Sequence, residues 1–355
     1  MSMLDQIPDP VSASATAPAA PDQEKTGHEK PPDPWARVQK LAVRQLNRLV
    51  TLEPKVLRDE SPDAIHDLRV ASRRLQEVLD LLYPAPRPQE IQKLRRKLRR
   101  ARRALSELRN CDVLLERVGA ALAGKRSSHR DAWEALRAYL SERRAEAANK
   151  GLRKLSKINL AAFYLHLKRH VAAAGRPSEP AISPAAAGEV SGSAHGQLIT
   201  FPDGEETFGQ RLAKALESDW QAFEARVADS HGDQRAPLIH QVRIAAKRLR
   251  YLIEVVHEFD VEGSPEALGW LRRLQEHLGN WHDLEILEQM TIEMVGRPKF
   301  LRDHLDTALK IEKLVLRNRG SKKRLVERYV RMTLGSDEYR RLAQWVGRAL
   351  PPSAA

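Results

Sequence analysis

Three side chains that can carry positive charge, His66, Arg69 and Arg73, follow one another at intervals of three and four residues. On a helix this spacing places them along one stripe, with Arg74 at its edge. A guanidinium group donates paired hydrogen bonds to carboxylate or phosphate oxygens, and a histidine beside an anion readily becomes cationic. The stripe therefore has the chemistry of a site for an anion with several oxygens.

The same pattern occurs again further along the chain. The segments IHDLRVASRRL, from Ile65, and IHQVRIAAKRL, from Ile239, are identical at six of eleven positions. A repeat of this length indicates an internal duplication. The second segment presents the matching set of side chains, which are His240, Arg243, Lys247 and Arg248.

Both segments have the apolar spacing of an amphipathic helix, so each should be a helix with its charged stripe opposite its core face. Ser61 followed by Pro62 is a typical helix start, and Pro237 has the same place before His240. A plain solvated face usually mixes charges of both signs, whereas the first acid on the first stripe is Asp80. We therefore favour an anion site over two alternatives, a solvated helix face and a set of internal salt bridges.

The composition indicates a polyanion as the partner. The chain has 355 residues and a formal charge of +13, although its first 35 residues contain only two basic residues against six acidic ones. A field of this sign attracts nucleic acid, polyphosphate or an anionic membrane surface. No apolar run is long enough to span a membrane, no signal peptide is recognisable, and Cys111 is the only cysteine. We expect a cytoplasmic protein without membrane insertion.

The sequence predicts an all-α protein made of two helical bundles, because apolar residues recur with helical periodicity and no strand pattern is found. Residues 1–33 have the composition of a disordered tail, and residues 174–204, rich in Gly, Pro, Ser and Ala, have that of a linker. The first bundle is expected over 34–173 and the second over 205–350.

The most basic stretch of the chain begins at Ile91, and we expect it to form a helix with a narrow apolar stripe surrounded by arginine and lysine. After it, we expect a long helix over 127–173 with a break near Gly151. The final helical region should run over 299–349, with interruptions near Gly320 and Gly335.

A second pair of segments also matches between the two halves. LSELRNCDVL aligns with LGNWHDLEIL, which pairs Ser106 with Gly279 and Asn110 with Asp283. Together with the His-x-x-Arg repeats, these segments resemble the CHAD family, the conserved histidine α-helical domains, over about residues 34 to 350. The first half departs from the family's Leu-Gly-x-x-x-Asp element at Ser106 and Asn110.

The resemblance implies two pseudo-symmetric four-helix bundles that bind inorganic polyphosphate in a basic groove or cavity between them. It also implies association with polyphosphate granules, and the chain looks like a member without the CYTH domain that some relatives carry. On this basis the predicted polyphosphate-binding residues are His66, Arg69, Arg73, Arg74, Arg96, Lys97, Arg100, Arg103, Arg109, His240, Arg243, Lys247, Arg248, Lys322, Lys323 and Arg324.

Three other functions are compatible with parts of the sequence. The dipeptides His66-Asp67 and His282-Asp283 are found in metal phosphohydrolases, but neither dipeptide is kept in the other half. A nucleic-acid-binding protein would explain the charge, although aromatic residues are only 5% of the chain. An interaction scaffold that uses the acidic tail is the third alternative. We expect no enzyme activity, cofactor or catalytic metal, and the sequence identifies no protein partner.

Overall fold

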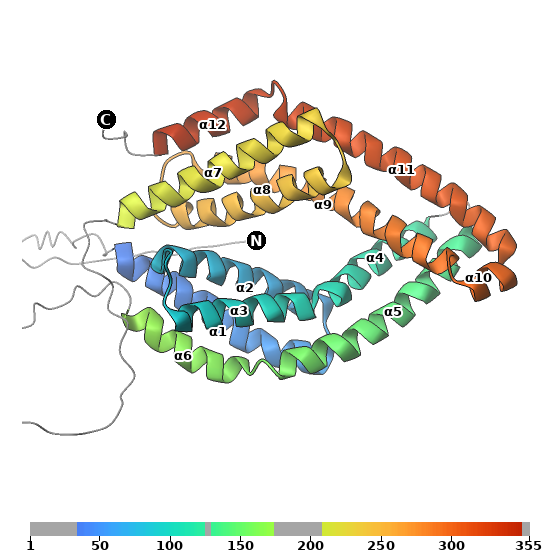
Figure 1. The fold of residues 1–355 in the computed structure, drawn as a ribbon, viewed down its shortest axis with the longest axis horizontal. Helices are drawn as coiled ribbons and strands as arrows, with labels where there is room; N and C mark the ends of the chain where they lie inside the picture. The colour runs from blue at the N-terminus through green and yellow to red at the C-terminus, as the bar shows by residue number, and fades with distance from the viewer. Residues whose placement is uncertain (1–33, 125–128, 174–207, 350–355) are drawn as a thin grey trace, which may run out of the picture. The chain divides into compact units, whose positions relative to one another are not determined.

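The computed structural model describes residues 34–124, 129–173 and 208–349, which belong to one compact unit. Every regular element among them is a helix, which confirms the predicted all-α class (Figure 1). The predicted tail, the predicted linker and residue 350 lie outside the described residues. The helices before the predicted linker are α1 (Pro34–Asp59), α2 (Pro62–Leu82), α3 (Gln89–Ala104), α4 (Ser106–Ala123), α5 (Arg130–Ser156) and α6 (Leu160–Ala173).

In this part of the chain, α1 and α2 form a helical hairpin, and α6 packs on α1. Helix α3 packs against α2 and α5, and α4 and α5 form a second hairpin. The helices after the predicted linker are α7 (Phe208–Gly232), α8 (Ala236–His257), α9 (Ser264–Val295), α10 (Pro298–Asp303), α11 (Leu305–Thr333) and α12 (Asp337–Ala349). Here α7 pairs with α8, α8 with α9, and α9 with α11.

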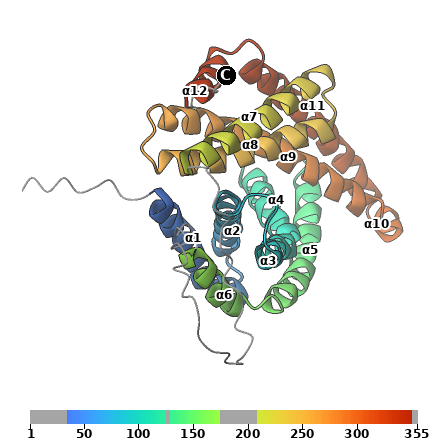
Figure 2. The same cartoon turned by 60° about the vertical axis from the view of Figure 1, so that its left-hand side comes forward.

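The two predicted halves contact each other along two regions. Helix α2 packs beside α8, as Figures 1 and 2 both show, and their buried residues belong to one hydrophobic cluster. A second cluster joins α4 and α5 to α9 and α11 through residues such as Cys111, Leu136, Leu287 and Ile311. The division into two bundles stays a prediction, because the halves share both of these clusters.

The expected helix break near Gly151 is wrong. Gly151 lies inside α5, and a Cβ atom there would lie 2.6 Å from the backbone oxygen of Ala104. Glycine at this position permits the close approach of α5 to the end of α3. The break comes instead at Asn159, whose φ of 53° is left-handed and whose side chain accepts a hydrogen bond from Ala162 N at 3.0 Å.

Two other interruptions also differ from expectation. Helix α11 continues through Gly320, while the predicted interruption near Gly335 is confirmed between α11 and α12. The basic segment that begins at Ile91 is two helices, because α3 ends at Ala104 and α4 begins at Ser106. Leu105 separates them, with φ −96° and ψ 6°. The matching segment of the other half lies within the continuous helix α9.

Candidate anion-binding site

Local sequence signals set the direction in which the charged stripes of α2 and α8 face. The hydroxyl of Ser61 caps α2 by accepting a hydrogen bond from Ala64 N at 3.4 Å, with Pro62 at the start of the helix, as predicted. Ile65 and Leu68 are fully buried on α2, and Ile239 and Val242 are buried at the equivalent places on α8. The charged stripes are therefore turned away from the core of each helix.

The two stripes line one cavity. It has a volume of about 890 Å³ and lies between α2, α3 and α4 of the first half and α8 and α9 of the second. Its wall contains ten arginine and lysine side chains against three carboxylates, Glu77, Asp80 and Asp283. The cationic side chains are Arg69, Arg73, Arg87, Arg95, Arg99, Arg102, Arg109, Arg243, Lys247 and Arg248.

Some of these cations are already engaged within the protein. Asp80 forms ion pairs with Arg95 at 2.6 Å and Arg87 at 3.5 Å, so its single carboxylate offsets one of the two positive charges at that part of the wall. Arg248 pairs with Asp219 of α7 at 2.8 Å.

Two arginines of the wall are fixed by neutral acceptors. Arg102 donates to Ser72 O at 3.0 Å and to the Gln76 side chain. Arg69 donates to the Ser106 hydroxyl at 2.9 Å and to the backbone oxygen of Arg102. These bonds hold both guanidinium groups in place and leave their positive charge unbalanced.

Five cations of the wall form no side-chain hydrogen bond or ion pair with the residues that the structure describes. Among them, Arg243 has an Nε atom that is buried and has no hydrogen-bond partner in the described part of the chain. A buried donor without a partner costs free energy, and a ligand that accepts its hydrogen bond would recover it. The five are Arg73, Arg99, Arg109, Arg243 and Lys247.

Burial and mutual repulsion disfavour the charged forms of the cavity's cations. Burial, together with neighbouring arginines, lowers the pKa of Arg69 and of Arg243 to about 10, which still leaves both protonated at neutral pH. Burial next to Arg243, Arg73 and Arg69 lowers the pKa of Lys247 well below its ordinary range. A bound polyanion would oppose both effects by supplying the missing negative charge.

The pKa values of the histidines in the wall are lowered as well. Burial, followed by the charge of nearby cations, lowers the pKa of His66 and His240, and it lowers that of His282 to about 3. His240 and His282 lie with ring centroids 5.0 Å apart. In contrast, burial raises the pKa of Glu77 to about 7. The free cavity therefore favours neutral histidines beside a dense group of permanent cations.

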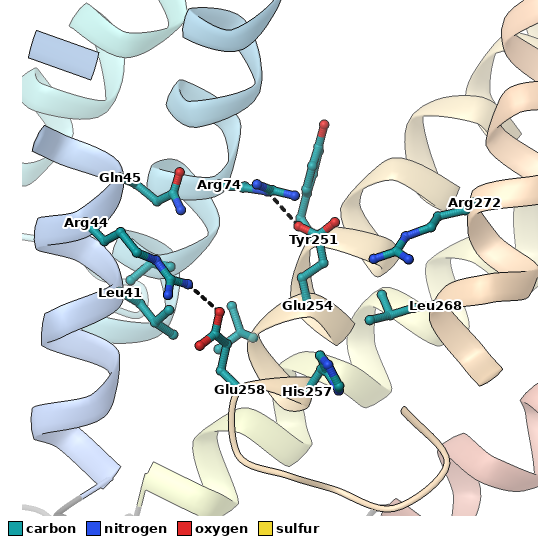
Figure 3. A pocket seen from close by; sticks show the side chains of 12 residues that line it. Leu41, Arg44, Gln45, Arg74, Tyr251, Glu254, His257, Glu258, Leu268 and Arg272 are labelled. Carbon is teal, nitrogen blue, oxygen red and sulfur yellow. Dashed lines mark hydrogen bonds and ion pairs between the residues drawn. The ribbon is translucent and has the colours of Figure 1, made fainter. Parts of the chain in front are cut away.

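The structure brings half of the predicted binding residues together and places the others elsewhere. The residues that line the cavity are His66, Arg69, Arg73, Arg109, His240, Arg243, Lys247 and Arg248. Arg74 lies in a separate pocket, where its guanidinium pairs with Glu254 of α8 at 2.7 Å (Figure 3). It joins the two halves from outside the cavity.

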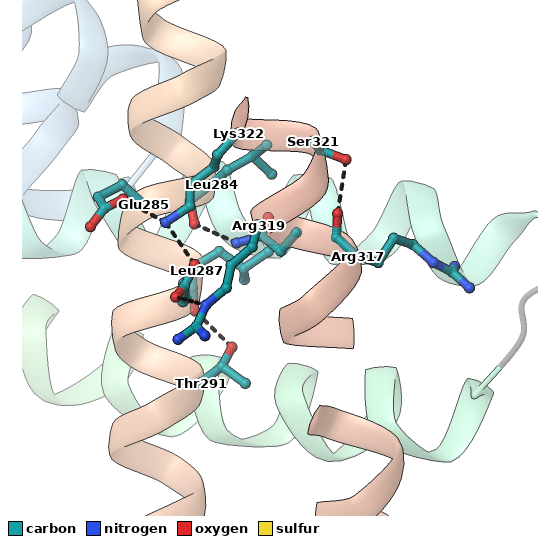
Figure 4. Close-up of polar contacts among 10 residues, drawn as sticks. Leu284, Glu285, Leu287, Thr291, Arg317, Arg319, Ser321 and Lys322 are labelled. Carbon is teal, nitrogen blue, oxygen red and sulfur yellow. Dashed lines mark hydrogen bonds and ion pairs between the residues drawn. The ribbon is translucent and has the colours of Figure 1, made fainter. Parts of the chain in front are cut away.

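The remaining predicted residues also do not line the cavity. Arg96, Lys97, Arg100 and Arg103 lie on α3 outside the lining of the cavity. Lys322 of α11 is held by Glu285 at 2.7 Å and Glu288 at 2.6 Å, both on α9 (Figure 4). Its neighbours Lys323 and Arg324 are exposed.

Sequence reasoning missed four arginines of the wall, Arg87, Arg95, Arg99 and Arg102. Three of them lie on α3 at intervals of four and three residues, which is the spacing of a single helix stripe. This signal is present in the sequence, but both sides of α3 are equally basic. Only the packing of α3 against α2 shows which side faces the cavity.

The described residues contain no group of three or more His, Cys, Asp and Glu side chains arranged to hold a metal ion. No helix in the described ranges is long and apolar enough to cross a membrane.

Comparison with known proteins identifies the family. No curated protein matches the chain. In fold, the chain is similar to the CHAD domain from the plant Ricinus communis, with a TM-score of 0.55 and 17% identity over 89% of this chain and 92% of that one. It is also similar to PptA from Streptomyces chartreusis, with a TM-score of 0.53 and 15% identity over 87% and 99% of the two chains. The CHAD domain model matches residues 40–291, which is most of the chain, and the protein therefore belongs to the CHAD domain family.

Proposed function

We propose that this protein binds inorganic polyphosphate in the cavity between α2 and α8, and that it does so without chemical conversion of the ligand. The observation that carries the proposal is a group of five cations that line the cavity from both halves and have no partner among the described residues, namely Arg73, Arg99, Arg109, Arg243 and Lys247. A polyphosphate chain presents anionic oxygens at every unit. It can accept charge-assisted hydrogen bonds from several of these groups at once.

The lining of the cavity favours a phosphate chain over nucleic acid. Tyr251 is the only phenylalanine, tyrosine or tryptophan side chain that lines it among the described residues. Proteins that bind single strands without sequence preference stack bases on exposed aromatic rings. Trp220, Trp270, Trp281 and Trp345 are instead buried in the core. The wall offers many donors for phosphate oxygens and little surface for bases.

The comparison of the two halves favours binding over catalysis. His66, Arg69 and Arg74 recur as identical residues in the second repeat, whereas Asp67 is replaced by glutamine at the matching position. Asp283 likewise corresponds to Asn110. The polar positions that the two repeats retain as identical residues can all carry positive charge, and a polyanion site needs that charge more than it needs an acid or base. Association with polyphosphate granules belongs to the same proposal.

A competition titration tests the ligand class. The purified protein, loaded with labelled long-chain polyphosphate at near-physiological salt, is titrated with unlabelled polyphosphate, duplex DNA and single-stranded RNA at equal phosphate concentration. We expect polyphosphate to compete at far lower concentration than either nucleic acid. Equal competition by all three, or stronger competition by a nucleic acid, would overturn the proposal, because salt-dependent binding is common to all polyanions.

A charge-reversal variant tests the site. Arg69→Glu combined with Arg243→Glu should nearly abolish polyphosphate binding, because both side chains lie at the centre of the two repeats. The matched control is Arg328→Glu with Arg331→Glu on α11, which makes the same change in net charge outside the cavity. Equal binding by the two double variants would show that net charge alone, and not this cavity, attracts the ligand.

A further inference from the structure

Helix α3 carries more positive charge than the cavity uses. Eight of its sixteen residues are lysine or arginine, against one glutamate, Glu90. Arg95, Arg99 and Arg102 line the cavity. The outer cations of α3, which we define as Arg96, Arg100 and Arg103, are exposed on the other side of the helix.

The outer cations of α3 have no internal partner. Within the ranges that the structure describes, none of the three forms a side-chain hydrogen bond or ion pair. Some exposed arginines elsewhere on the protein do so, since Arg37 pairs with Asp260 and Arg273 pairs with Glu338. Others, such as Arg328 and Arg331, likewise have no such partner among the described residues. The outer face of α3 is therefore basic without the mixed charges that a solvated helix face normally has.

The fold of α3 does not depend on these charges. Ile91, Leu94, Leu98 and Ala101 are buried and attach the helix to the core. Like charges along one helix face are unfavourable for the helix itself. A surface that repeats this arrangement over two turns is best accounted for by an anion that balances it.

The outer cations continue from the edge of the cavity. Arg99 lines the cavity and is also exposed, so it lies at the rim. At 100° per residue, Arg103 and Arg96 follow Arg99 around the helix on the side away from the core, and Arg100 comes next. Positive charge thus passes without interruption from the inner wall, over the rim, to the outer surface of α3.

We propose that the outer cations of α3 form an external track that binds the part of a long polyphosphate chain that extends beyond the cavity. This inference rests on the proposed function, since it assumes that the cavity holds polyphosphate. The cavity is limited to about 890 Å³, so a long chain has to leave it. From Arg96 to Arg103 the helix rises by about 10 Å, which lets the three guanidinium groups contact successive phosphates.

The track predicts an effect that depends on chain length. The variant Arg96→Glu, Arg100→Glu, Arg103→Glu should bind tripolyphosphate with an affinity within about twofold of the natural protein, because the cavity is intact. Its affinity for long-chain polyphosphate should fall by about tenfold, since three exposed contacts become repulsive. Both affinities are measured by calorimetric titration at the same salt concentration.

The matched control reverses Arg328 and Arg331 on α11 and Arg341 on α12, which are exposed, carry the same charge and do not line the cavity. The control should lose much less affinity for the long chain. An equal loss in both triple variants would overturn the track, as would an equal loss for tripolyphosphate and the long chain. A milder variant with glutamine at the three α3 positions should show the same order of effects and guards against misfolding.

Two further outcomes separate the proposals. If the natural protein binds neither tripolyphosphate nor the long chain, the proposed function fails. If the natural protein binds both and the α3 variant loses only binding of duplex DNA, the track is a nucleic-acid surface and the inference is overturned while the proposed function stands.

Discussion

Arg69 and Arg243 occupy equivalent positions in the two repeats, but only Arg69 is held by its surroundings. Arg69 donates to the Ser106 hydroxyl and to the backbone oxygen of Arg102. Arg243 has a buried Nε without a hydrogen-bond partner in the described part of the chain. At equivalent positions of the two repeats, Arg69 is therefore a fixed element of the wall and Arg243 is a free donor.

The difference comes from the helices that face them. At Leu105 the first half has a break between α3 and α4, where the backbone oxygen of Arg102 and the hydroxyl of Ser106 are available to Arg69. The corresponding stretch of the second half is inside α9, and Gly279 offers no hydroxyl at the position of Ser106. One serine and one helix break thus decide whether the arginine is satisfied internally.

At a second pair of equivalent positions, the two halves differ in which helix carries the arginine. In the first half Arg102, on α3, donates to Gln76 on α2. In the second half Gln275, on α9, accepts from Arg250 on α8 at 2.8 Å. The hydrogen-bonded pair is kept with its donor and acceptor exchanged, and this exchange places Arg102 on the cavity wall, whereas Arg250 is outside it. At these two pairs of positions the first half supplies two fixed arginines of the wall, Arg69 and Arg102, and the second supplies one free donor, Arg243.

The largest expected effect separates these roles by single substitutions. Arg243→Ala should weaken polyphosphate binding by about tenfold to a hundredfold, because a hydrogen bond to a charged group contributes roughly 1.5 to 3 kcal/mol. It should not destabilise the free protein, since a buried donor without a partner is removed. Arg69→Ala should instead lower the free energy of unfolding by about 1 to 3 kcal/mol and weaken binding less.

Both quantities are measurable on the same preparations, by urea unfolding without ligand and by calorimetric titration with polyphosphate. Equal losses of stability and of affinity in the two variants would contradict the distinction between a fixed and a free arginine.

A dependence on pH is the next effect in size. The pKa of His66 and of His240 is lowered by burial and then by cations that include Arg109, Arg243 and Lys247. Because the folded-state pKa lies below the unfolded value of about 6.5, the free protein should lose stability as the pH falls below about 6.5. A bound polyanion favours the protonated rings, so its affinity should rise several-fold, about threefold to tenfold, over the same interval.

The control is the double variant His66→Gln, His240→Gln, titrated with the same ligand at the same pH values. It keeps any titration of polyphosphate itself and removes that of the two rings. An identical pH profile for the variant and the natural protein would show that these histidines take no part in binding.

The sequence was sufficient for features that depend on one helix at a time. The apolar faces of α2 and α8, the Ser61 cap and the opposed charged stripes follow from spacing alone, because a helix fixes the angles between its own residues. The position of Arg74 could not be predicted from spacing, because it depends on Glu254, which lies 180 residues away in the sequence. Lys322 was likewise predicted to bind the ligand, but the carboxylates that hold it belong to a different helix.

Helix α3 shows most clearly how far the sequence alone can predict the site residues. Its apolar stripe predicted which side is buried, but arginines flank that stripe on both sides, so its sequence does not distinguish the cavity side from the outer side. The prediction chose Arg96, Lys97, Arg100 and Arg103, whereas the cavity is lined by Arg95, Arg99 and Arg102. Only the packing of α3 against α2 distinguishes the two sets.

A smaller effect concerns the pair Asn110 and Asp283, which differ by one charge on the cavity wall. Asp283→Asn should raise polyphosphate affinity by about threefold to fivefold, because a carboxylate that repels the ligand is removed. Asn110→Asp should lower it by a similar factor. Asp67→Asn is the matched control, since Asp67 pairs with Arg48 outside the cavity. If the control changes affinity as much as Asp283→Asn, overall charge and not the wall determines binding.

The smallest effect tests the cause of the difference between the two arginines. A Cβ atom at Gly279 would meet nothing within 4 Å, so Gly279→Ser should be accepted by α9 and stabilise the helix by roughly 0.5 kcal/mol. The new hydroxyl would give Arg243 the partner that Ser106 gives Arg69, and polyphosphate affinity should fall by about twofold. The reciprocal change Ser106→Gly should remove one of the two acceptors of Arg69 and raise affinity by a similar factor, with some loss of stability. Calorimetric titration of both variants checks the pair of signs. Affinity changes of the same sign in the two variants would show that the hydroxyl does not control the availability of these arginines.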